Sequence, residues 1–423
     1  MYTIVNPLAR DGKPLRLERL TLRELLLPLK EPFRISSGTQ TSRRILLLEL
    51  EDAEGTSVWS ECVAPEEPNY NGEAIDTAWI ALEQWVAPRV LGSSFVSPAE
   101  IFPALQHNFR GHLMAKAAVE MGMWALAAEQ RGVSLTCLLG GTRTEVEVGI
   151  SLGIQSSPAA LVERARRALE EGYRKVKLKI EPGADVEYVR AVRTALGPKA
   201  PLMADANNAY SLEHAEPLLR LDELDLIMIE QPLAWDDLRQ HAELQHRLRT
   251  PICLDESITS LERAREMVEL GSGRVINIKP GRVGGFTASI AIHDFCAAQG
   301  IPVWCGGMLE SGVGRAYNVA LASLPNFTKP GDISPSARYW EQDVVSPEWT
   351  MHDGMMTVPS GAGIGVEVDR ERVEWLMVRE LALEAGKHGG AGLQRRGRWA
   401  ARREARRGSE EAERRGTEEE DTA

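Results

Sequence analysis

From about residue 145 onward, short apolar runs alternate with longer stretches in which apolar positions recur every three to four residues. The short runs are typical of buried strands, and the longer stretches have the period of amphipathic helices. Seven strands are predicted in this way, at Val146–Ile154, Lys175–Ile180, Leu202–Ala204, Leu226–Ile229, Ile252–Leu254, Val275–Ile278 and Val303–Cys305. Strands separated by single helices indicate right-handed β-α-β units. This many units in succession favour an α/β fold closed into a (β/α)8-type barrel, a modified TIM barrel.

The preceding residues show a different pattern, in which strands come first and helices follow. Apolar runs bounded by turn residues predict strands at Leu25–Leu29, Ile45–Leu50 and Ser57–Val63. Helical periodicity then predicts helices at Glu73–Val90, Pro98–Asn108 and Met114–Arg131. We therefore predict an N-terminal α+β capping domain over residues 1–125 and the barrel, with the catalytic site, over residues 126–330.

The chain after residue 330 loses this regular alternation. We expect residues 331–383 to return to the capping domain. Residues 384–423 are rich in charged residues and glycine, and Trp399 is the one large apolar residue between Arg395 and Asp421. Such a composition buries too little apolar surface to offset the entropy of ordering the chain. It predicts a disordered charged tail.

Composition and charge narrow the function classes. The formal net charge of −12 argues against a nucleic-acid-binding protein, which would present a basic surface. No apolar run approaches the roughly 18 residues of a membrane-spanning helix, and no apolar signal core follows Met1. The five cysteines are scattered and form no C-x-x-C pair, which is typical of reduced thiols. We expect a cytoplasmic enzyme that acts on small molecules, with no nucleic acid and no membrane as partner.

Three acidic residues close consecutive predicted strands: Asp205, Glu230 and Asp255, spaced 25 positions apart. Equivalent strand ends converge at the C-terminal mouth of a barrel, where active sites lie. Oxygen ligands without a thiolate or an imidazole suit Mg²⁺, or Mn²⁺, better than zinc. Any one of these acids alone could cap the helix that follows it, but three in register predict a divalent-cation site.

Lysines flank these acids along the predicted barrel rim. Lys175, Lys177 and Lys179 alternate along one strand and therefore share a face, and a strand inside a barrel has no solvated edge. We expect this face to point into the barrel mouth. Lys279 closes the strand after Asp255. We predict that Lys179 and Lys279 form an acid/base pair on opposite sides of the barrel.

This set of residues suits removal of a proton from the carbon beside a substrate carboxylate. The resulting dianion is unfavourable, and a divalent cation on the carboxylate would stabilise it. An amine base needs a depressed pKa near neutral pH, and we expect the charges of Lys177 and of the cation to lower the pKa of Lys179. Arg282 is predicted to lower the pKa of Lys279 in the same way. Lys177 and Asn207 are also predicted to contact the substrate.

Two other interpretations stay open. A barrel with lysines at its strand ends can be a Schiff-base aldolase, although that function leaves the three acids unexplained. The chain could also be a non-catalytic binding protein on an enzyme scaffold, although all five proposed catalytic positions are present.

Taken together, these motifs resemble the enolase superfamily, in its muconate-lactonizing-like subgroup. The resemblance spans about residues 16–380 and rests on the capping domain, the Lys-x-Lys strand, the three strand-end acids and the opposing lysine. Finer motifs are similar to the branch of o-succinylbenzoate synthases and N-succinyl (N-acyl) amino acid racemases. They are Gly-Tyr-Arg-Lys-Val-Lys-Leu-Lys-Ile at 172–180, Ile-Glu-Gln-Pro-Leu-Ala-Trp-Asp-Asp at 229–237, and Trp-Cys-Gly-Gly-Met-Leu-Glu-Ser-Gly at 304–312.

The resemblance implies that Lys179 and Lys279 are catalytic and that a loop at Phe33–Thr39 closes over the substrate. It also implies that the substrate pocket is lined by Ser151, Gly307 and Met308. It further implies a Mg²⁺ cofactor, a small carboxylate substrate and a homo-oligomer.

Two reactions share such a site in these proteins. One is the dehydration of 2-succinyl-6-hydroxy-2,4-cyclohexadiene-1-carboxylate by o-succinylbenzoate synthase in menaquinone biosynthesis, which we favour. The other is the racemisation of N-succinyl or N-acyl amino acids, and one protein can carry both activities. Dipeptide epimerases have an Asp-x-Asp motif on the last strand, where this chain has Gly307-Met308-Leu309. This difference argues against a dipeptide substrate.

Overall fold

The computed structural model describes residue 9 and residues 12–35 and 38–386; residues 1–8, 10–11, 36–37 and 387–423 lie outside the described residues. The predicted charged tail is therefore almost entirely outside them, and its first residue, Glu384, is the last residue of a strand. The middle of the predicted loop Phe33–Thr39 also lies outside them. The two sides of that loop are the ends of two paired strands.

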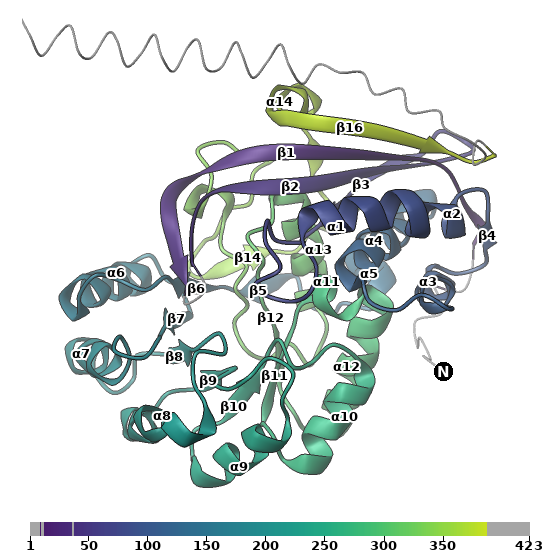
Figure 1. The fold of residues 1–423 in the computed structure, drawn as a ribbon. Helices are drawn as coiled ribbons and strands as arrows, with labels where there is room; N and C mark the ends of the chain where they lie inside the picture. Colours follow the sequence, from purple (N-terminus) through teal and green to yellow (C-terminus); the bar gives the residue numbers. More distant parts are fainter. Residues whose placement is uncertain (1–8, 10–11, 36–37, 387–423) are drawn as a thin grey trace, which may run out of the picture.

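The N-terminal part forms an antiparallel sheet that lies over one side of the barrel (Figure 1). Its strands, in spatial order, are β16 (Met377–Glu384), β1 (Leu15–Ile35), β2 (Gly38–Asp52) and β3 (Ser57–Cys62), and β4 (Ser94–Phe95) pairs with β1. The three predicted strands are confirmed, but β1 and β2 are much longer than the apolar runs that predict them. Their polar residues join the strands through backbone pairing, as Arg34 does with Thr39, and no apolar pattern marks such residues.

The capping helices are α1 (Ile75–Ala81), α2 (Ala87–Val90), α3 (Ile101–Gln106), α4 (Leu113–Gln130) and α5 (Leu135–Leu139). The helix predicted over Glu73–Val90 is helical from Ile75 to Val90, but a π-helical turn at Leu82–Val86 separates α1 from α2. Pro88 has no N–H to donate to the preceding turn, so the hydrogen-bond pattern changes just before it. The buried helix α4 packs against both the sheet and the barrel. Gly122 allows the close approach to β2, since a Cβ there would lie 2.7 Å from Leu50 Cδ1.

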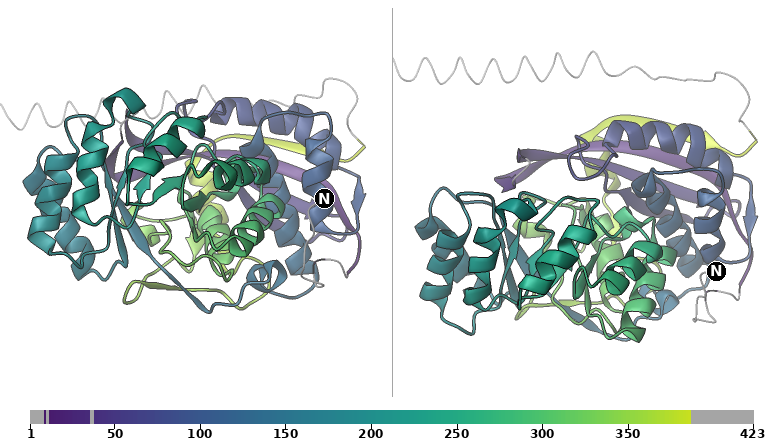
Figure 2. Two further views of the ribbon diagram at one scale, coloured as in Figure 1. Left: turned by 90° about the horizontal axis from the view of Figure 1, so that it is seen from below. Right: turned by 60° about the horizontal axis from the view of Figure 1, so that its bottom comes forward.

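The barrel contains parallel strands that follow one another in chain order around a sheet, as predicted. They are β6 (Gly149–Leu152), β7 (Lys175–Lys179), β8 (Leu202–Asp205), β9 (Ile229–Glu230), β10 (Ile252–Leu254), β11 (Val275–Ile278) and β12 (Val303–Cys305). The helices between and after them are α6 (Pro158–Glu170), α7 (Val186–Leu196), α8 (Glu216–Leu221), α9 (Arg239–Arg247), α10 (Leu261–Leu270), α11 (Pro280–Val283), α12 (Phe286–Ala298) and α13 (Gly312–Ala322). Helices α6 to α10 and α12 lie in an arc outside the strands (Figure 1; further views in Figure 2).

Short elements complete the described chain. They are the pair β5 (Glu145–Glu147) and β14 (Met355–Thr357), the pair β13 (Val345–Ser346) and β15 (Glu367–Val368), and helix α14 (Arg370–Leu376). The boundary that we predict between the two domains, at residue 125, falls inside α4. The domain limits therefore stay predictions.

An irregular segment closes the ring between β12 and β6. The Asp332 N–H donates to the Cys305 carbonyl of β12 over 2.9 Å, and the Gly149 N–H of β6 donates to the Gly331 carbonyl over 2.7 Å. Gly331 also forms a parallel bridge with Val148. Residues 331 and 332 thus occupy the position of an eighth strand, although no apolar run predicts a strand there.

The barrel interior is divided into an apolar layer and a charged layer. Side chains two residues apart on a strand point the same way, so each layer takes alternate residues. The apolar layer is a separate buried cluster of Met203, Met228, Cys253, Val275 and Trp304. Two residues further along three of these strands are the predicted metal ligands Asp205, Glu230 and Asp255. The apolar cluster therefore forms the floor beneath the charged residues.

Two buried glutamates of the capping domain hold the barrel at helix N-termini. Glu120 of α4 accepts hydrogen bonds from the backbone N–H groups of Phe286 and Thr287, at the start of α12, over 2.7 and 2.9 Å. A side chain at Gly285 would collide with this carboxylate, since its Cβ would lie 2.1 Å from Glu120 Oε2. Glu61 of β3 accepts in the same way from Ser311 and from α13. Helix N-termini favour such acidic acceptors because their N–H groups have no partners within the helix.

We expect Glu120→Ala to lower the free energy of unfolding by about 3 kcal/mol, because several buried donors lose their acceptor. Urea denaturation followed by circular dichroism measures this difference. The control is Glu129→Ala, an exposed position on the same helix, which should change the free energy by no more than about 0.5 kcal/mol. Equal stability of the two variants would contradict a role for Glu120 in joining the domains.

Candidate active site

The strand ends bring the predicted site residues to one level of the barrel. Lys179 pairs in register with Asp205, and Asp205 pairs with Glu230 on the next strand. Side chains of residues paired across parallel strands lie on the same face of a sheet. Ser151 pairs with Lys177 in this way, so it shares the face of the lysines. The side chains of all five of these residues are buried.

Lys177 lies between three carboxylates. Its Nζ is 3.1 Å from Asp205 Oδ2, 3.1 Å from Glu230 Oε2 and 2.5 Å from Asp332 Oδ2. Together these acids outweigh the effect of burial, which would lower the pKa of this ammonium, and they hold the pKa well above its ordinary value. Lys177 is therefore a permanent cation in this arrangement.

Lys179 lies beside it at the open end of β7. Its Nζ is 2.6 Å from Asp205 Oδ2 and 2.5 Å from Asn207 Oδ1. The Asn207 amide also lies 3.4 Å from Glu256 Oε1. The structure thus brings the predicted base and the predicted substrate contact Asn207 into direct contact.

Lys279 directly follows β11. Three strands, β8, β9 and β10, separate β11 from β7, which carries Lys179. The Lys279 Nζ is 2.7 Å from Asp255 Oδ2 and lies 4.5 Å from the ring centroid of Tyr70. Arg282 bonds to the other oxygen of Asp255, to the Ile258 carbonyl and to the Tyr70 hydroxyl. Asp255 therefore forms ion pairs with both Lys279 and Arg282, the two cations on this side of the barrel.

The charges on this side shift the pKa of Lys279 in a defined direction. Burial disfavours the ammonium, but the charge of Asp255, together with Tyr70 and the nearby glutamates, outweighs burial and raises the pKa of Lys279. Burial also opposes ionisation of Asp255, and Lys279 with Arg282 overcomes it and lowers the pKa of Asp255. In this arrangement the predicted lowering of the pKa of Lys279 is not seen. Arg282 neutralises Asp255, so its influence on Lys279 acts through that carboxylate.

The three predicted ligands fit a divalent cation in donor chemistry and in charge. Burial and then repulsion from Asp205 raise the pKa of Glu230, and Asp255 adds to that repulsion. Buried carboxylates that repel one another are stabilised by a shared cation. In the part of the chain that the structure describes, no three His, Cys, Asp or Glu side chains form a ready-made metal cluster. The lysine ammonium groups are bonded to these carboxylates instead.

The remaining predicted contacts lie around the same mouth. Among the described residues, the buried Ser151 hydroxyl has no hydrogen-bond partner, so it is available to a ligand. Gly307 lies against Asp332, and a Cβ at this glycine would be 2.5 Å from the Asp332 carbonyl oxygen. Met308 and Lys279 line one small cavity together with Glu310.

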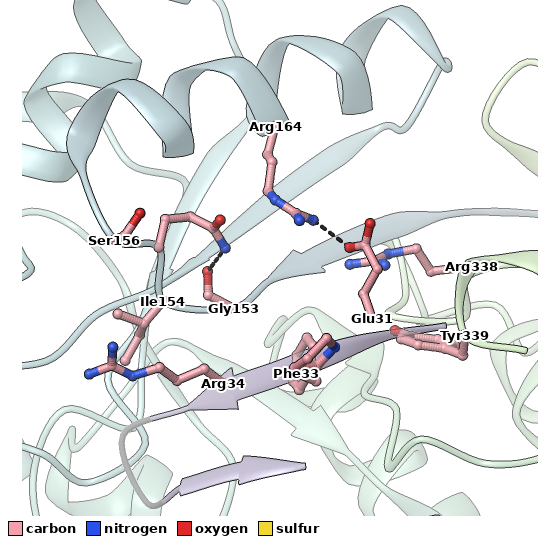
Figure 3. A pocket seen from close by; sticks show the side chains of 11 residues that line it. Glu31, Phe33, Arg34, Gly153, Ile154, Ser156, Arg164, Arg338 and Tyr339 are labelled. Carbon is pink, nitrogen blue, oxygen red and sulfur yellow. Dashed lines mark hydrogen bonds and ion pairs between the residues drawn. The ribbon is translucent and has the colours of Figure 1, made fainter. Parts of the chain in front are cut away.

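A second, larger pocket lies where the β1–β2 hairpin reaches the barrel (Figure 3). Its volume is about 130 Å³, and it is lined by Glu31–Arg34, Gly153–Ser156, Arg164, Arg338 and Tyr339. Arg164 extends from α6 and bonds to Glu31 over 2.8 Å. Arg34 bonds to Glu181, two residues beyond Lys179, over 3.0 Å. The hairpin is thereby tied to the strand that carries the predicted base.

Sequence reasoning missed three residues of the site. Tyr70 comes from an irregular capping loop and donates to Asp255 Oδ1 over 2.8 Å, and no periodicity marks it. Asp332 lies in the irregular segment that closes the barrel. Glu256 directly follows Asp255, and the Asp-Glu pair at a strand end is a signal that could have drawn attention to it.

Comparison with known proteins identifies the family to which this chain belongs. Residues 19–140 match the mandelate racemase / muconate lactonizing enzyme N-terminal domain, and residues 160–373 match the enolase C-terminal domain-like family. This chain belongs to the enolase superfamily. The predicted modified TIM barrel with an N-terminal α+β capping domain is confirmed.

The similar proteins of the enolase superfamily span nearly the same length. An o-succinylbenzoate synthase of Geobacillus kaustophilus is 49% identical over 85% of this chain and 96% of its own. An N-succinylamino acid racemase of Thermus thermophilus is 52% identical over 88% of this chain and 100% of its own. A solved enolase superfamily structure from Listeria innocua has a TM-score of 0.84 and 38% identity, and the match covers 87% of this chain and 99% of that one.

Membership of the enolase superfamily carries further properties. Its members are enzymes that generally use Mg²⁺, and small carboxylate substrates fit the family. In the described residues, no helix has the length and apolar character needed to cross a lipid bilayer.

Proposed function

We propose that this chain removes a proton from the carbon beside a substrate carboxylate, and that its main reaction is that of o-succinylbenzoate synthase. The observation that carries the proposal is the placement of Lys179 and Lys279 on opposite sides of a ring, with three acid-bearing strands between them. A flat, deprotonated substrate between the two lysines would present one face to each. The naming of similar proteins as o-succinylbenzoate synthases supports this substrate class.

Asp205, Glu230 and Asp255 would hold the Mg²⁺ ion. When bound, the cation would supply charge stabilisation at the substrate carboxylate as negative charge develops there. The protein's own residues do the rest. Lys177, Asn207 and Ser151 would orient the substrate, and the buried mouth excludes water, which strengthens each electrostatic contact.

In the dehydration, Lys179 would take the proton and then return it to the departing hydroxyl group, so that water leaves. Lys279 would stay protonated throughout and face the developing negative charge. The raised pKa of Lys279, caused mainly by Asp255, suits this role. The dehydration therefore needs no change in the protonation state of Lys279.

Racemisation of N-succinylamino acids is the second candidate, supported by the 52% identical racemase. It requires Lys279 to exchange a proton as Lys179 does. Asp255 raises the pKa of Lys279 and so disfavours the loss of its proton. Racemisation therefore requires other cations to offset the negative charge of Asp255. Arg282 already bonds to Asp255, and a bound Mg²⁺ would add to that effect.

We assign the pocket of Figure 3 to the part of the substrate remote from the reacting carbon. It is lined by Gly153–Ser156, which begin two residues after Ser151. Three arginines, Arg34, Arg164 and Arg338, line it together with one acid, Glu31; Arg164 is bonded to Glu31, and Arg34 is bonded to Glu181. Guanidinium groups bind carboxylates well, and a succinyl group carries a carboxylate at its far end.

We expect Lys179→Ala to lower turnover of the synthase substrate, and α-proton exchange of N-succinylamino acids, by about 10²–10⁴-fold, because the group that moves the proton is lost. Proton NMR in D₂O with Mg²⁺ measures both reactions and ranks them. Lys199→Ala, at an exposed position, is the control. Full activity of Lys179→Ala would exclude the mechanism, and inactivity of the unaltered protein on both substrates would exclude the substrate class.

We expect Mg²⁺ to stabilise the folded protein by about 2.7 kcal/mol at a concentration 100 times its dissociation constant, since it binds only the folded state. Thermal unfolding with and without EDTA measures this effect. Glu230→Gln should abolish most of the stabilisation, whereas Glu181→Gln, an acid of the mouth bonded to Arg34, should retain it. A Glu230→Gln variant that Mg²⁺ stabilises fully would remove Glu230 from the ligand set.

We expect Arg282→Gln to shift the pH–rate profile of N-succinylamino acid exchange to higher pH. Without the guanidinium, the charge of Asp255 acts more strongly on Lys279 and raises the pKa of that amine further. The neutral form that accepts a proton then appears only at higher pH. An unchanged profile, measured with Arg274→Gln as an exposed control, would refute this role of Arg282.

A further inference from the structure

Asp332 is a buried carboxylate with two ammonium partners on the catalytic strand. Its Oδ2 is 2.5 Å from Lys177 Nζ, and its Oδ1 is 3.2 Å from Lys175 Nζ. These cations outweigh burial, which alone would raise the pKa of this acid, and lower its pKa. Asp332 belongs neither to the proposed metal ligands nor to the acid/base pair.

The position of Asp332 is fixed from several directions. Its N–H donates to the Cys305 carbonyl, and its own carbonyl accepts from Arg315 over 3.1 Å. Lys175 is fully buried beneath it, with its Nζ 3.4 Å from the ring centroid of Trp304 in the apolar floor. The carboxylate is therefore a fixed anchor on the ring, beside the ammonium group of Lys177.

Lys177 competes with a divalent cation for the same oxygens. It bonds to Asp205 and Glu230, which are two of the three proposed ligands. A cation that takes these carboxylates displaces the ammonium from them. A buried ammonium without a partner is strongly unfavourable, so Lys177 needs another acceptor at that moment.

We propose that Asp332 is the positioning residue that retains Lys177 when the divalent cation takes Asp205 and Glu230. Asp332 is the nearest of the three carboxylates to Lys177, and it lies on the far side of β7 from Asp205, next to β6 and β12. Metal binding then removes Asp205 and Glu230 as counter-ions of Lys177 but leaves Asp332, so that the buried ammonium keeps a partner. Lys177 stays a cation at the mouth, where it faces the substrate carboxylate.

This inference rests on the proposed metal site, so the experiment measures Mg²⁺ binding directly, by titration calorimetry without substrate. Asp332→Asn should weaken Mg²⁺ binding by about tenfold or more, which is the size of effect expected from a residue that supports a metal site without touching the metal. Asp332→Glu, which keeps the charge, should restore most of the affinity. Asp343→Asn removes another buried carboxylate of the same C-terminal segment, bonded to Gly312 and Ser336, and should leave the affinity unchanged.

The decisive comparison repeats Asp332→Asn in a Lys177→Met background. If Asp332 acts through Lys177, its loss should then change the affinity by less than about threefold, since position 177 no longer carries an ammonium that competes with the metal. A simple loss of negative charge, or a loosened fold, would weaken binding equally in both backgrounds, and that result would overturn the proposal. Unchanged affinity in Asp332→Asn alone would also overturn it. Failure of the unaltered protein to bind Mg²⁺ would instead refute the metal site on which the proposal rests.

Discussion

The charged layer of the barrel depends on one constraint, which is that buried charges must be balanced by neighbours of opposite sign. Four lysines and Arg282 are buried there, at positions 175, 177, 179, 279 and 282. They face the buried acids at positions 205, 230, 255, 256 and 332. Each cation in this group lies within ion-pair distance of an acid from a strand end or from the closing segment. The barrel strands therefore bring opposite charges together, and the ion pairs between these charges hold the side chains in place.

Both domains contribute residues that stabilise this charged layer. The barrel supplies the charged groups and an apolar floor that includes Trp304. The capping domain supplies Tyr70, which bonds to Asp255, and the hairpin whose Arg34 reaches Glu181. Glu120 joins the two domains at the start of a barrel helix. A site of this kind needs both domains, because the charges of one are covered by the other.

Much of the barrel could be predicted from the sequence, because apolar runs and helical periods report burial directly. The strands at 252–254, 275–278 and 303–305 have the limits that the pattern predicts. The even spacing of the strand-end acids likewise predicts that they converge. The outer parts of β1 and β2, the strand β16, and the closing segment could not be predicted, since their backbone pairing leaves no apolar signal. Tyr70 and Asp332 were missed because both lie in irregular segments, where no periodic pattern marks a residue, and their partners lie far away in the sequence.

The closing segment and β16 also have a consequence for how the chain becomes functional during synthesis. The ring is completed by residues 331 and 332, and the N-terminal sheet is completed by β16, which pairs Arg19 with Glu384. Contacts between residues so distant in sequence are slow to form and come late. A nascent chain that ends before residue 331 has an open ring, in which Lys175 and Lys177 lack one of their counter-ions. The N-terminal strands must wait for β16 before their sheet is whole, so the ring of the barrel can close before the capping sheet is complete.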